Sequence, residues 1–169
     1  MSVKIRLIQH ADLPAVIALQ DRCYSDALYE PPALLSQRLA SAPQSCWLVE
    51  AADGELLAYL FSYPALLGKV TVLASPFAVA QKPELLYLHD MAVSDQARGQ
   101  GVARALLMQA KQYAAELGLS TLALVAVQGS VPYWQKQGFV IQPPLNAAAE
   151  AALKSYTGER AQYMLWCVQ

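Results

Sequence analysis

The chain has 169 residues, of which 56% are hydrophobic and 15% charged, so it is long enough for one domain over residues 1–169 with a buried core. Twelve Lys and Arg against thirteen Asp and Glu give a net charge of −1, which argues against nucleic acid and anionic membranes as partners. Three widely spaced cysteines and the lack of an apolar run of ~18 residues argue against a disulfide framework, a metal cluster and a membrane span, and favour a reducing cytoplasm.

The hydrophobic periodicity and the turn signals predict strands and helices that follow one another along the chain. In chain order we expect a strand over residues 3–8, helices over 12–23 and 33–40, and strands over 45–51, 55–63 and 85–93. A helix over 101–117, a strand over 122–127, a helix over 131–137 and strands over 139–142 and 163–168 follow. This order predicts an α/β (α+β) fold in which a mixed sheet carries helices on both faces.

Residues 64–83 lack a clear hydrophobic period. The segment is apolar and irregular, and we expect a short strand over residues 70–73 within it. Long segments without secondary structure are uncommon and are often functional, so we expect an insertion near a binding site.

A glycine-rich turn joins the strand over 85–93 to the helix that follows it. Gly99 and Gly101 remove side chains where the backbone must approach a ligand. Amides at a helix N-terminus can hold a phosphate-bearing group, so we expect a cofactor to bind here. The residues of this predicted cradle are Arg98, Gly99, Gln100, Gly101, Val102, Ala103 and Arg104. A tight turn without a ligand is the alternative.

Two other phosphate-binding motifs are absent from the sequence. The chain has no Gly-x-Gly-x-x-Gly, which a dinucleotide-binding fold would carry after its first strand. It also has no Gly-Lys-Ser/Thr, which a P-loop nucleotide-binding protein requires. The turn therefore predicts a different class of phosphate-bearing cofactor.

The turn resembles the signature of the GCN5-related N-acetyltransferases, because Gln96-Ala-Arg-Gly-Gln-Gly101 fits Gln/Arg-x-x-Gly-x-Gly/Ala. A second segment, residues 130–139, is similar to the family's Ala-x-x-Phe-Tyr-x-x-x-Gly-Phe. The resemblance implies acetyl-CoA as co-substrate and a mostly antiparallel central sheet. It also implies that the strands over 85–93 and 122–127 splay apart, with the pantetheine arm bonding the backbone of Met91, Ala92 and Val93.

A narrower resemblance concerns the strand itself. Leu88-His-Asp-Met-Ala-Val93 is similar to the Leu-His-x-x-Ala-Val strand of arylalkylamine N-acetyltransferases, and residues 131–139 resemble that subgroup's Val-Pro-Phe-Tyr segment. This resemblance implies that His89 stands at a position that carries a base. The N-terminal third of the chain is less alike.

Acetylation of an amine requires a base for the ammonium proton and a proton for the leaving thiolate. His89 is the first candidate for the base because its ordinary pKa suits neutral pH, and a structural histidine is the alternative. Asp90 would face the other side of a regular strand, unless a bulge re-aims it. The resemblance puts Trp134 where the family has its acidic tyrosine, so we expect Trp134 beside the cofactor and the adjacent Tyr133 as the candidate acid.

The loop over residues 24–32 is expected to overhang the acceptor. Tyr24, Tyr29 and Glu30 supply aromatic faces and a carboxylate, which together can hold an ammonium group. An ordinary surface loop is the alternative.

These features predict an N-acetyltransferase that acts on a small amine, an arylalkylamine or another alkylamine, in a ternary complex without an acyl-cysteine. Two alternatives stay open. One is a CoA-binding sensor with little catalysis, and the other is transfer to a protein N-terminus or lysine. The acceptor and the oligomeric state are not specified, and a homodimer is one option.

Overall fold

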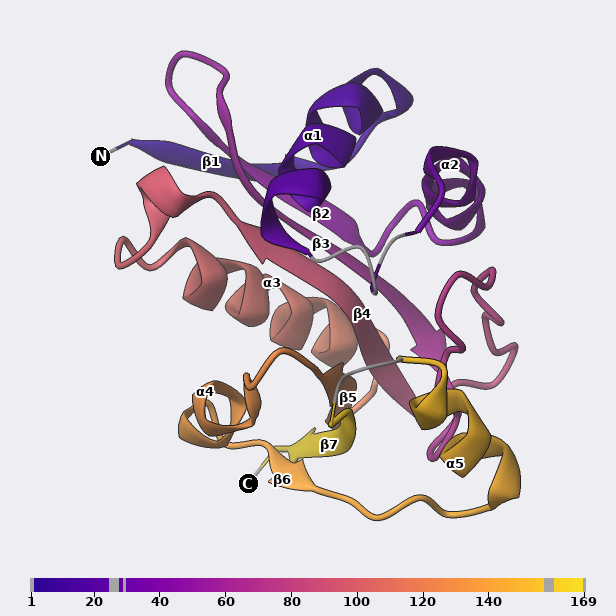
Figure 1. Ribbon diagram of the computed structural model, residues 1–169. Coiled ribbons are helices and arrows are strands. Elements are labelled where there is room, and N and C mark those ends of the chain that lie inside the picture. The colour runs from indigo at the N-terminus through magenta and orange to yellow at the C-terminus, as the bar shows by residue number, and fades with distance from the viewer. Residues whose placement is uncertain (1, 25–27, 29, 157–159, 169) are drawn as a thin grey trace.

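The computed structural model describes residues 2–24, 28, 30–156 and 160–168. Within these residues a seven-stranded sheet runs in the order β1-β2-β3-β4-β5-β7-β6 (Figure 1). Neighbouring strands are antiparallel except for β4 and β5, which are parallel, so the sheet is mixed and mostly antiparallel as predicted. The strands are β1 (Val3–Leu7), β2 (Cys46–Ala51), β3 (Leu56–Ala65), β4 (Leu85–Val93), β5 (Thr121–Ala126), β6 (Val140–Ile141) and β7 (Gln162–Cys167).

Helices cover both faces of this sheet, which confirms the predicted fold class. Apolar residues of α1 (Leu13–Cys23), α2 (Pro32–Ser41) and α5 (Ala147–Lys154) pack on one face. Those of α3 (Val102–Glu116) and α4 (Val131–Lys136) pack on the other (Figure 1). Two 3-10 turns, η1 (His10–Asp12) and η3 (Asp95–Ala97), precede α1 and follow β4. Among the described residues no helix is long and apolar enough to cross a membrane.

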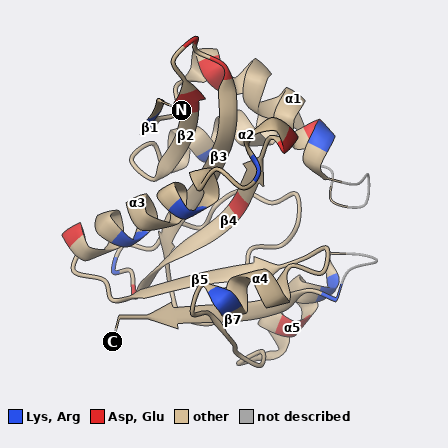
Figure 2. Cartoon of the chain, turned by 90° about the vertical axis from the view of Figure 1, so that its left-hand side faces the viewer, with Lys and Arg blue, Asp and Glu red and all other residues tan. Residues whose placement is uncertain are grey.

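The central strands β3 and β4 are buried on both faces because they carry apolar side chains at nearly every position. Tyr59 and Phe61 face α1 and α2, whereas Ala58 and Leu60 face α3. Each large apolar side chain buried in this way contributes roughly 1.5–3 kcal/mol. The strand that carries His89 is therefore held rigidly from both sides. Figure 2 shows charged residues spread over many elements instead of gathered on one of them.

The expected strand over residues 70–73 is wrong, because no strand forms between β3 and β4. The backbone there bonds side chains that follow α5 instead of another strand. Leu73 N–H donates to Ser155 Oγ at 2.9 Å, and Tyr156 Oη donates to the Thr71 carbonyl at 2.8 Å. The irregular course of the segment is confirmed.

Helix α5 is not among the elements that the sequence predicts. Asn146 caps it, since its side-chain oxygen accepts a 2.8 Å hydrogen bond from Ala149 N–H. Ala149 and Ala152 then pack into the core beside the 66–84 segment. The cap and the alanine-rich run were a readable signal for this helix.

Candidate functional site

A cleft opens where β4 and β5 separate. The two strands pair only between Leu86–Leu88 and Leu122–Leu124, although β4 continues to Val93 and β5 to Ala126. The divergence leaves a cavity of about 660 Å³ between them. The splayed strands expected from the family resemblance are present.

The cavity gathers most of the predicted site residues from distant parts of the chain. Gln100 is not part of its lining, and Tyr29 lies outside the described residues. The predicted residues that line it are Tyr24, Glu30, His89, Asp90, Met91, Ala92, Val93, Arg98, Gly99, Gly101, Val102, Ala103, Arg104, Tyr133 and Trp134.

At one end of the cavity, α3 begins with free amides. Gly101 has a left-handed φ of 79° and precedes the helix, whose first bond runs from Ala105 N–H to the Gly101 carbonyl at 3.0 Å. The N–H groups of Val102, Ala103 and Arg104 therefore lack a helical acceptor. No other acceptor for them is found among the described residues.

Two N–H groups of the predicted cradle already donate hydrogen bonds within the turn itself. Arg98 N–H donates to the Asp95 carbonyl at 3.4 Å, and Gln100 N–H donates to the Ala97 carbonyl at 3.2 Å. The free donors are consequently those of the helix start and the two glycines. A Cβ placed on Gly99 or Gly101 would meet nothing within 4 Å, so the space in front of them is open. Free amides, open space and a helix N-terminus fit the pyrophosphate of coenzyme A.

The open edge of β4 offers backbone groups for an extended ligand. Ser94 N–H bonds the Leu57 carbonyl of the neighbouring chain segment at 2.8 Å. Because backbone groups alternate along a strand, those of Ala92 also point toward β3, whereas those of Met91 and Val93 face the cleft. The Met91 and Val93 carbonyls already accept from Tyr24 Oη and Cys23 Sγ, so their N–H groups, and not those of Ala92, fit an extended ligand such as a pantetheine arm.

A β-bulge decides where His89 and Asp90 point. Phe61 of β3 pairs with Asp90, but the next residue, Ser62, pairs with Leu88, so His89 is an extra residue on β4. Both His89 and Asp90 consequently project toward α1 and α2. The His89 ring contacts Phe77, with ring centroids 5.5 Å apart. In a regular strand the two side chains would lie on opposite faces, so the bulge is what brings them together.

His89 belongs to a buried cluster with Glu30 and Arg38. Arg38 is fully buried and donates to both Glu30 carboxylate oxygens, at 2.8 and 2.6 Å. His89 Nε2 lies 3.1 Å from Glu30 Oε1, and its side chain is only 2% exposed. Burial alone would raise the pKa of Glu30, but His89 and Arg38 outweigh it and hold that pKa well below its ordinary range.

Sequence reasoning missed Arg38, although a signal existed. Leu34, Leu35, Arg38 and Leu39 share one stripe at helical spacing, and all are buried in α2. An arginine on the apolar face of a short helix must find a buried partner. The partner, Glu30, is eight positions away and precedes the helix.

Asp90 has one satisfied and one unsatisfied oxygen. Oδ2 accepts a 2.9 Å hydrogen bond from Tyr59 Oη and a 3.4 Å bond from Gln20 Nε2. Oδ1 has no partner among the described residues, and neither has His89 Nδ1. Asp90 is 6% exposed, and this burial raises the pKa of its carboxyl.

Tyr24 closes this side of the site. Its hydroxyl donates a 2.7 Å hydrogen bond to the Met91 carbonyl on the open edge of β4. Burial of the hydroxyl, together with the Asp90 charge, raises the pKa of Tyr24 well above its ordinary value. Tyr24 therefore stays a neutral phenol that fixes the end of α1 against the cleft.

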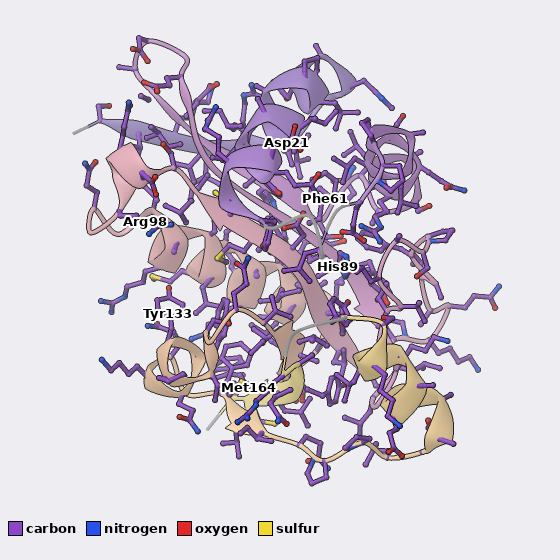
Figure 3. All side chains as sticks on the ribbon, in the orientation of Figure 1. Asp21, Phe61, His89, Arg98, Tyr133 and Met164 are labelled. Carbon is purple, nitrogen blue, oxygen red and sulfur yellow. The ribbon has the colours of Figure 1, made fainter. Side chains whose placement is uncertain are left out.

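Tyr133 and Trp134 face β4 from across the cavity. Their rings meet edge to face at 5.0 Å, and Trp134 packs on Phe139 at 5.4 Å. Tyr133 is 40% exposed, and partial burial raises the pKa of its phenol. Figure 3 shows Tyr133 on the side of α4, apart from His89 near the middle of the molecule. A half-exposed phenol on a cavity wall can exchange protons with water.

The other end of the cavity has a wall made of the 66–84 segment and the residues after α5. Leu73 and Tyr156 line the cavity there, and their backbone and side-chain bonds join the two elements. Arg38 bonds the Ser75 carbonyl at 3.0 and 2.6 Å, which fastens the same segment to α2. From the predicted insertion, Leu73 therefore reaches the cavity, and the insertion's role near a binding site stays a prediction.

Solved structures resemble this fold along nearly the whole chain. The loading GNATL domain of CurA from Lyngbya majuscula has a TM-score of 0.79 at 18% identity, covering 99% of this chain and 98% of that one. The GphF GNAT-like decarboxylase in complex with isobutyryl-CoA has a TM-score of 0.75 at 17% identity, covering 98% and 100%. The ribosomal-protein-S18-alanine N-acetyltransferase from Escherichia coli has a TM-score of 0.68 at 15% identity, covering 99% and 95%.

These likenesses concern the fold, because all are below 25% identity. No curated protein matches the chain. The sequence itself matches the Acetyltransferase (GNAT) family over residues 13–139, a span from the start of α1 to the end of the segment after α4. The chain therefore belongs to the GNAT acetyltransferase family, whose members are acyltransferases that use acyl-CoA.

Proposed function

We propose that the protein is an acetyl-CoA-dependent N-acetyltransferase that acts on a small amine by direct transfer in a ternary complex. One observation carries this proposal. The cavity that holds the free amides of α3 is also lined by His89 and Asp90, each of which has a buried polar atom without a partner among the described residues, Nδ1 and Oδ1. Buried polar atoms without partners mark a place where a ligand supplies the missing hydrogen bonds.

The charge at the end of the cavity that holds His89 and Asp90 favours an amine as the acceptor. Asp90 lines it with a carboxyl oxygen that has no partner among the described residues, whereas the Glu30 carboxylate, which also lines it, is paired with Arg38. An ammonium group would find a carboxylate and aromatic rings, while a carboxylated acyl group would meet like charge. GphF, which shares the fold, is a GNAT-like decarboxylase, but the acidic lining here favours a cationic acceptor instead.

The wall favours a small acceptor. Leu28, Leu73 and Tyr156 give the far end of the cavity an apolar surface, which suits the body of an arylalkylamine or another alkylamine. The hydrogen bonds among α2, the 66–84 segment and the residues after α5 leave this surface fixed. A long peptide would need an open groove, so transfer to a protein N-terminus or lysine is the weaker candidate.

The chemistry assigns a role to each residue. Acetyl-CoA would supply the thioester that the acceptor nitrogen attacks. An alkylammonium has a pKa of about 10 and must lose a proton first, and His89 is the proposed acceptor of that proton. The Asp90 carboxylate then stabilises the cationic form of the neighbouring His89. Tyr133, on the opposite wall, supplies the proton for the leaving thiolate. It takes this role because Trp134 stands at the position where the family has its general-acid tyrosine.

The decisive experiment is a panel of small amines screened by release of free thiol from acetyl-CoA. Some member should react, and His89→Gln should lower its kcat/KM by roughly 10²-fold. Full activity in His89→Gln would remove His89 as the base. A panel without any reaction, together with tight acetyl-CoA binding, would instead support the CoA-binding sensor.

The remaining parts of the proposal are location and assembly. Cys23, Cys46 and Cys167 are free, which suits a reducing cytoplasm. A homodimer stays a proposal, and analytical ultracentrifugation with and without acetyl-CoA tests it. Sedimentation as a monomer in both states would reject it.

A further inference from the structure

We propose that Glu30 and Arg38 are positioning residues, which hold a proton on Nε2 of His89 and thereby make Nδ1 the atom that accepts the substrate proton. The inference rests on the proposed function in giving His89 the role of base. It adds which nitrogen acts and what selects it. It also changes the expected role of Glu30 from binding substrate to orienting His89.

The first step concerns the charge of Glu30. Both of its oxygens accept bonds from Arg38, and Oε2 also accepts a 2.9 Å bond from Ala74 N–H. Such a set of donors stabilises the ionised carboxylate, which has acceptors only. His89 Nε2, at 3.1 Å from Oε1, must therefore be the donor.

The second step concerns the rest of the ring. A neutral imidazole carries one N–H, so a proton on Nε2 leaves a lone pair on Nδ1. That atom is buried, has no partner among the described residues and belongs to a side chain that lines the cavity. Tyr87 stacks on the ring at 6.2 Å and Phe77 meets it edge-on, so rotation about its bonds is restricted.

The third step concerns Arg38. Two bonds to the Ser75 carbonyl and a position 5.0 Å over the Phe77 ring fix its guanidinium. Arg38 supplies the counter-charge of Glu30, so the hydrogen bond from His89 Nε2 to that carboxylate does not require a second positive charge. Asp90 on the same strand, the neutral Tyr24 just after α1, Cys23 and Tyr156 are further titratable residues that line the cavity.

Histidine NMR tests this without any substrate. The chain has only His10 and His89, and His10 is exposed, so it serves as the reference in the same spectrum. In ¹⁵N-histidine-labelled protein, neutral His89 should show a protonated Nε2, an unprotonated Nδ1 and an Nε2–H that exchanges more slowly than that of His10. A proton on Nδ1, or exchange as fast as in His10, would overturn the proposal.

Variants then separate positioning from mere structure. Glu30→Gln should speed Nε2–H exchange toward the His10 rate and lower kcat by roughly 10²-fold, with the acetyl-CoA KM unchanged. Glu30→Asp, which keeps the charge, should restore part of both. Glu50→Gln removes another arginine-paired carboxylate, that of Arg6, and should change neither. If Glu30→Gln does not fold, the wild-type spectrum decides alone.

The two proposals can fail separately. A slow Nε2–H on His89 in a protein that acetylates no amine would support the positioning role and reject the acceptor class. An active enzyme with its proton on Nδ1 would do the reverse. An unchanged kcat in folded Glu30→Gln would also overturn the positioning role.

Discussion

Tyr59 Oη donates a 2.9 Å hydrogen bond to Asp90 Oδ2, while Asp90 Oδ1 receives none from the described residues. The neutral phenol satisfies only half of a carboxyl group that is 6% exposed. A buried acid that is half satisfied costs folding free energy and is kept where a ligand completes it. The stability of Asp90 variants therefore reports on function.

Asp90→Asn should stabilise the protein at neutral pH by about 1 kcal/mol, the usual size of such a gain. The raised pKa means that the unfolded chain loses the Asp90 proton more readily, so the wild type loses stability as pH rises from 3.8 through the folded pKa. The advantage of Asn should thus be present at pH 7.5 and shrink toward pH 4. Urea unfolding at both pH values measures it.

The control for this substitution is Asp53→Asn, in the β2–β3 turn. Asp53 is exposed and, within the described part of the chain, bonds Glu55 N–H alone, so its replacement should change the free energy of unfolding by at most about 0.5 kcal/mol. A loss of stability in Asp90→Asn at pH 7.5 would contradict the account of Asp90.

Arg38→Met should destabilise the fold by about 3 kcal/mol, because it leaves Glu30 charged and buried. Arg6→Met removes an arginine with two carboxylate partners, but the Arg6 side chain is 29% exposed, so the cost should be about 1 kcal/mol or less. Chemical denaturation at pH 7 compares the two. Equal costs would mean that burial does not govern the Arg38 pair.

The Arg38 pair also predicts a pH dependence. The pKa of Glu30 is held below its ordinary value of 4.5, so its contribution is complete above pH 4.5 and is lost as pH falls through the depressed pKa. The stability gap between wild type and Glu30→Gln should therefore be constant from pH 5 to 7 and narrow below pH 4. A gap that widens on acidification would have the wrong sign.

Acetyl-CoA at ~100-fold above its Kd should raise the Tm by about 5 °C, whereas NAD and ATP should not. Gly101→Ala should weaken this binding about tenfold, because its Cβ would stand before the free amides of α3. Gly54→Ala is the matched control, since Gly54 has a φ of 88° and the same open surroundings but lies in a distant hairpin.

Both glycine variants should lose about 1 kcal/mol of stability, which is the cost of a left-handed alanine. Only Gly101→Ala should lose affinity in calorimetric titration with coenzyme A. An equal affinity for the two variants would place the phosphates elsewhere.

Tyr156→Phe should raise the acceptor KM about fivefold, or ~1 kcal/mol, without changing the acetyl-CoA KM. It removes a bond to the Thr71 carbonyl from a residue that lines the cavity. Tyr163→Phe removes the acceptor of Gly68 N–H, and Tyr163 is not part of the cavity lining. Both should cost about 1 kcal/mol of stability, but Tyr163→Phe should leave both KM values as they are.

Much of the architecture could be predicted because local signals agree with tertiary structure. The strand over 85–93 has the predicted bounds. A run of buried apolar residues marks its start, and the polar turn that follows marks its end. The helix after Gly101 begins where a left-handed glycine requires it to begin. The family resemblance and the location of the cleft were both predicted from this strand and the glycine-rich turn after it.

The remainder depends on contacts between distant segments. Residues 70–73 have strand-forming side chains, but the residues after α5 satisfy their backbone, and sequence pattern does not contain that partner. The bulge at His89 is a mismatch between two strands, so β4 by itself cannot reveal it. Arg38 of α2 turns back to Glu30, which precedes the helix, and both contact the 66–84 segment, at Ser75 and Ala74.

The short parallel seam between β4 and β5 divides the sheet into a four-strand and a three-strand half, joined through Leu86–Leu88 and Leu122–Leu124. A ligand bound between the two halves would contact both of them and hold them together. Occupancy should therefore be felt far from the ligand, as slower hydrogen–deuterium exchange along both strands bordering the seam. The short pairing between β4 and β5 that creates the cavity should therefore also be the part of the sheet that opens most readily when no ligand is bound.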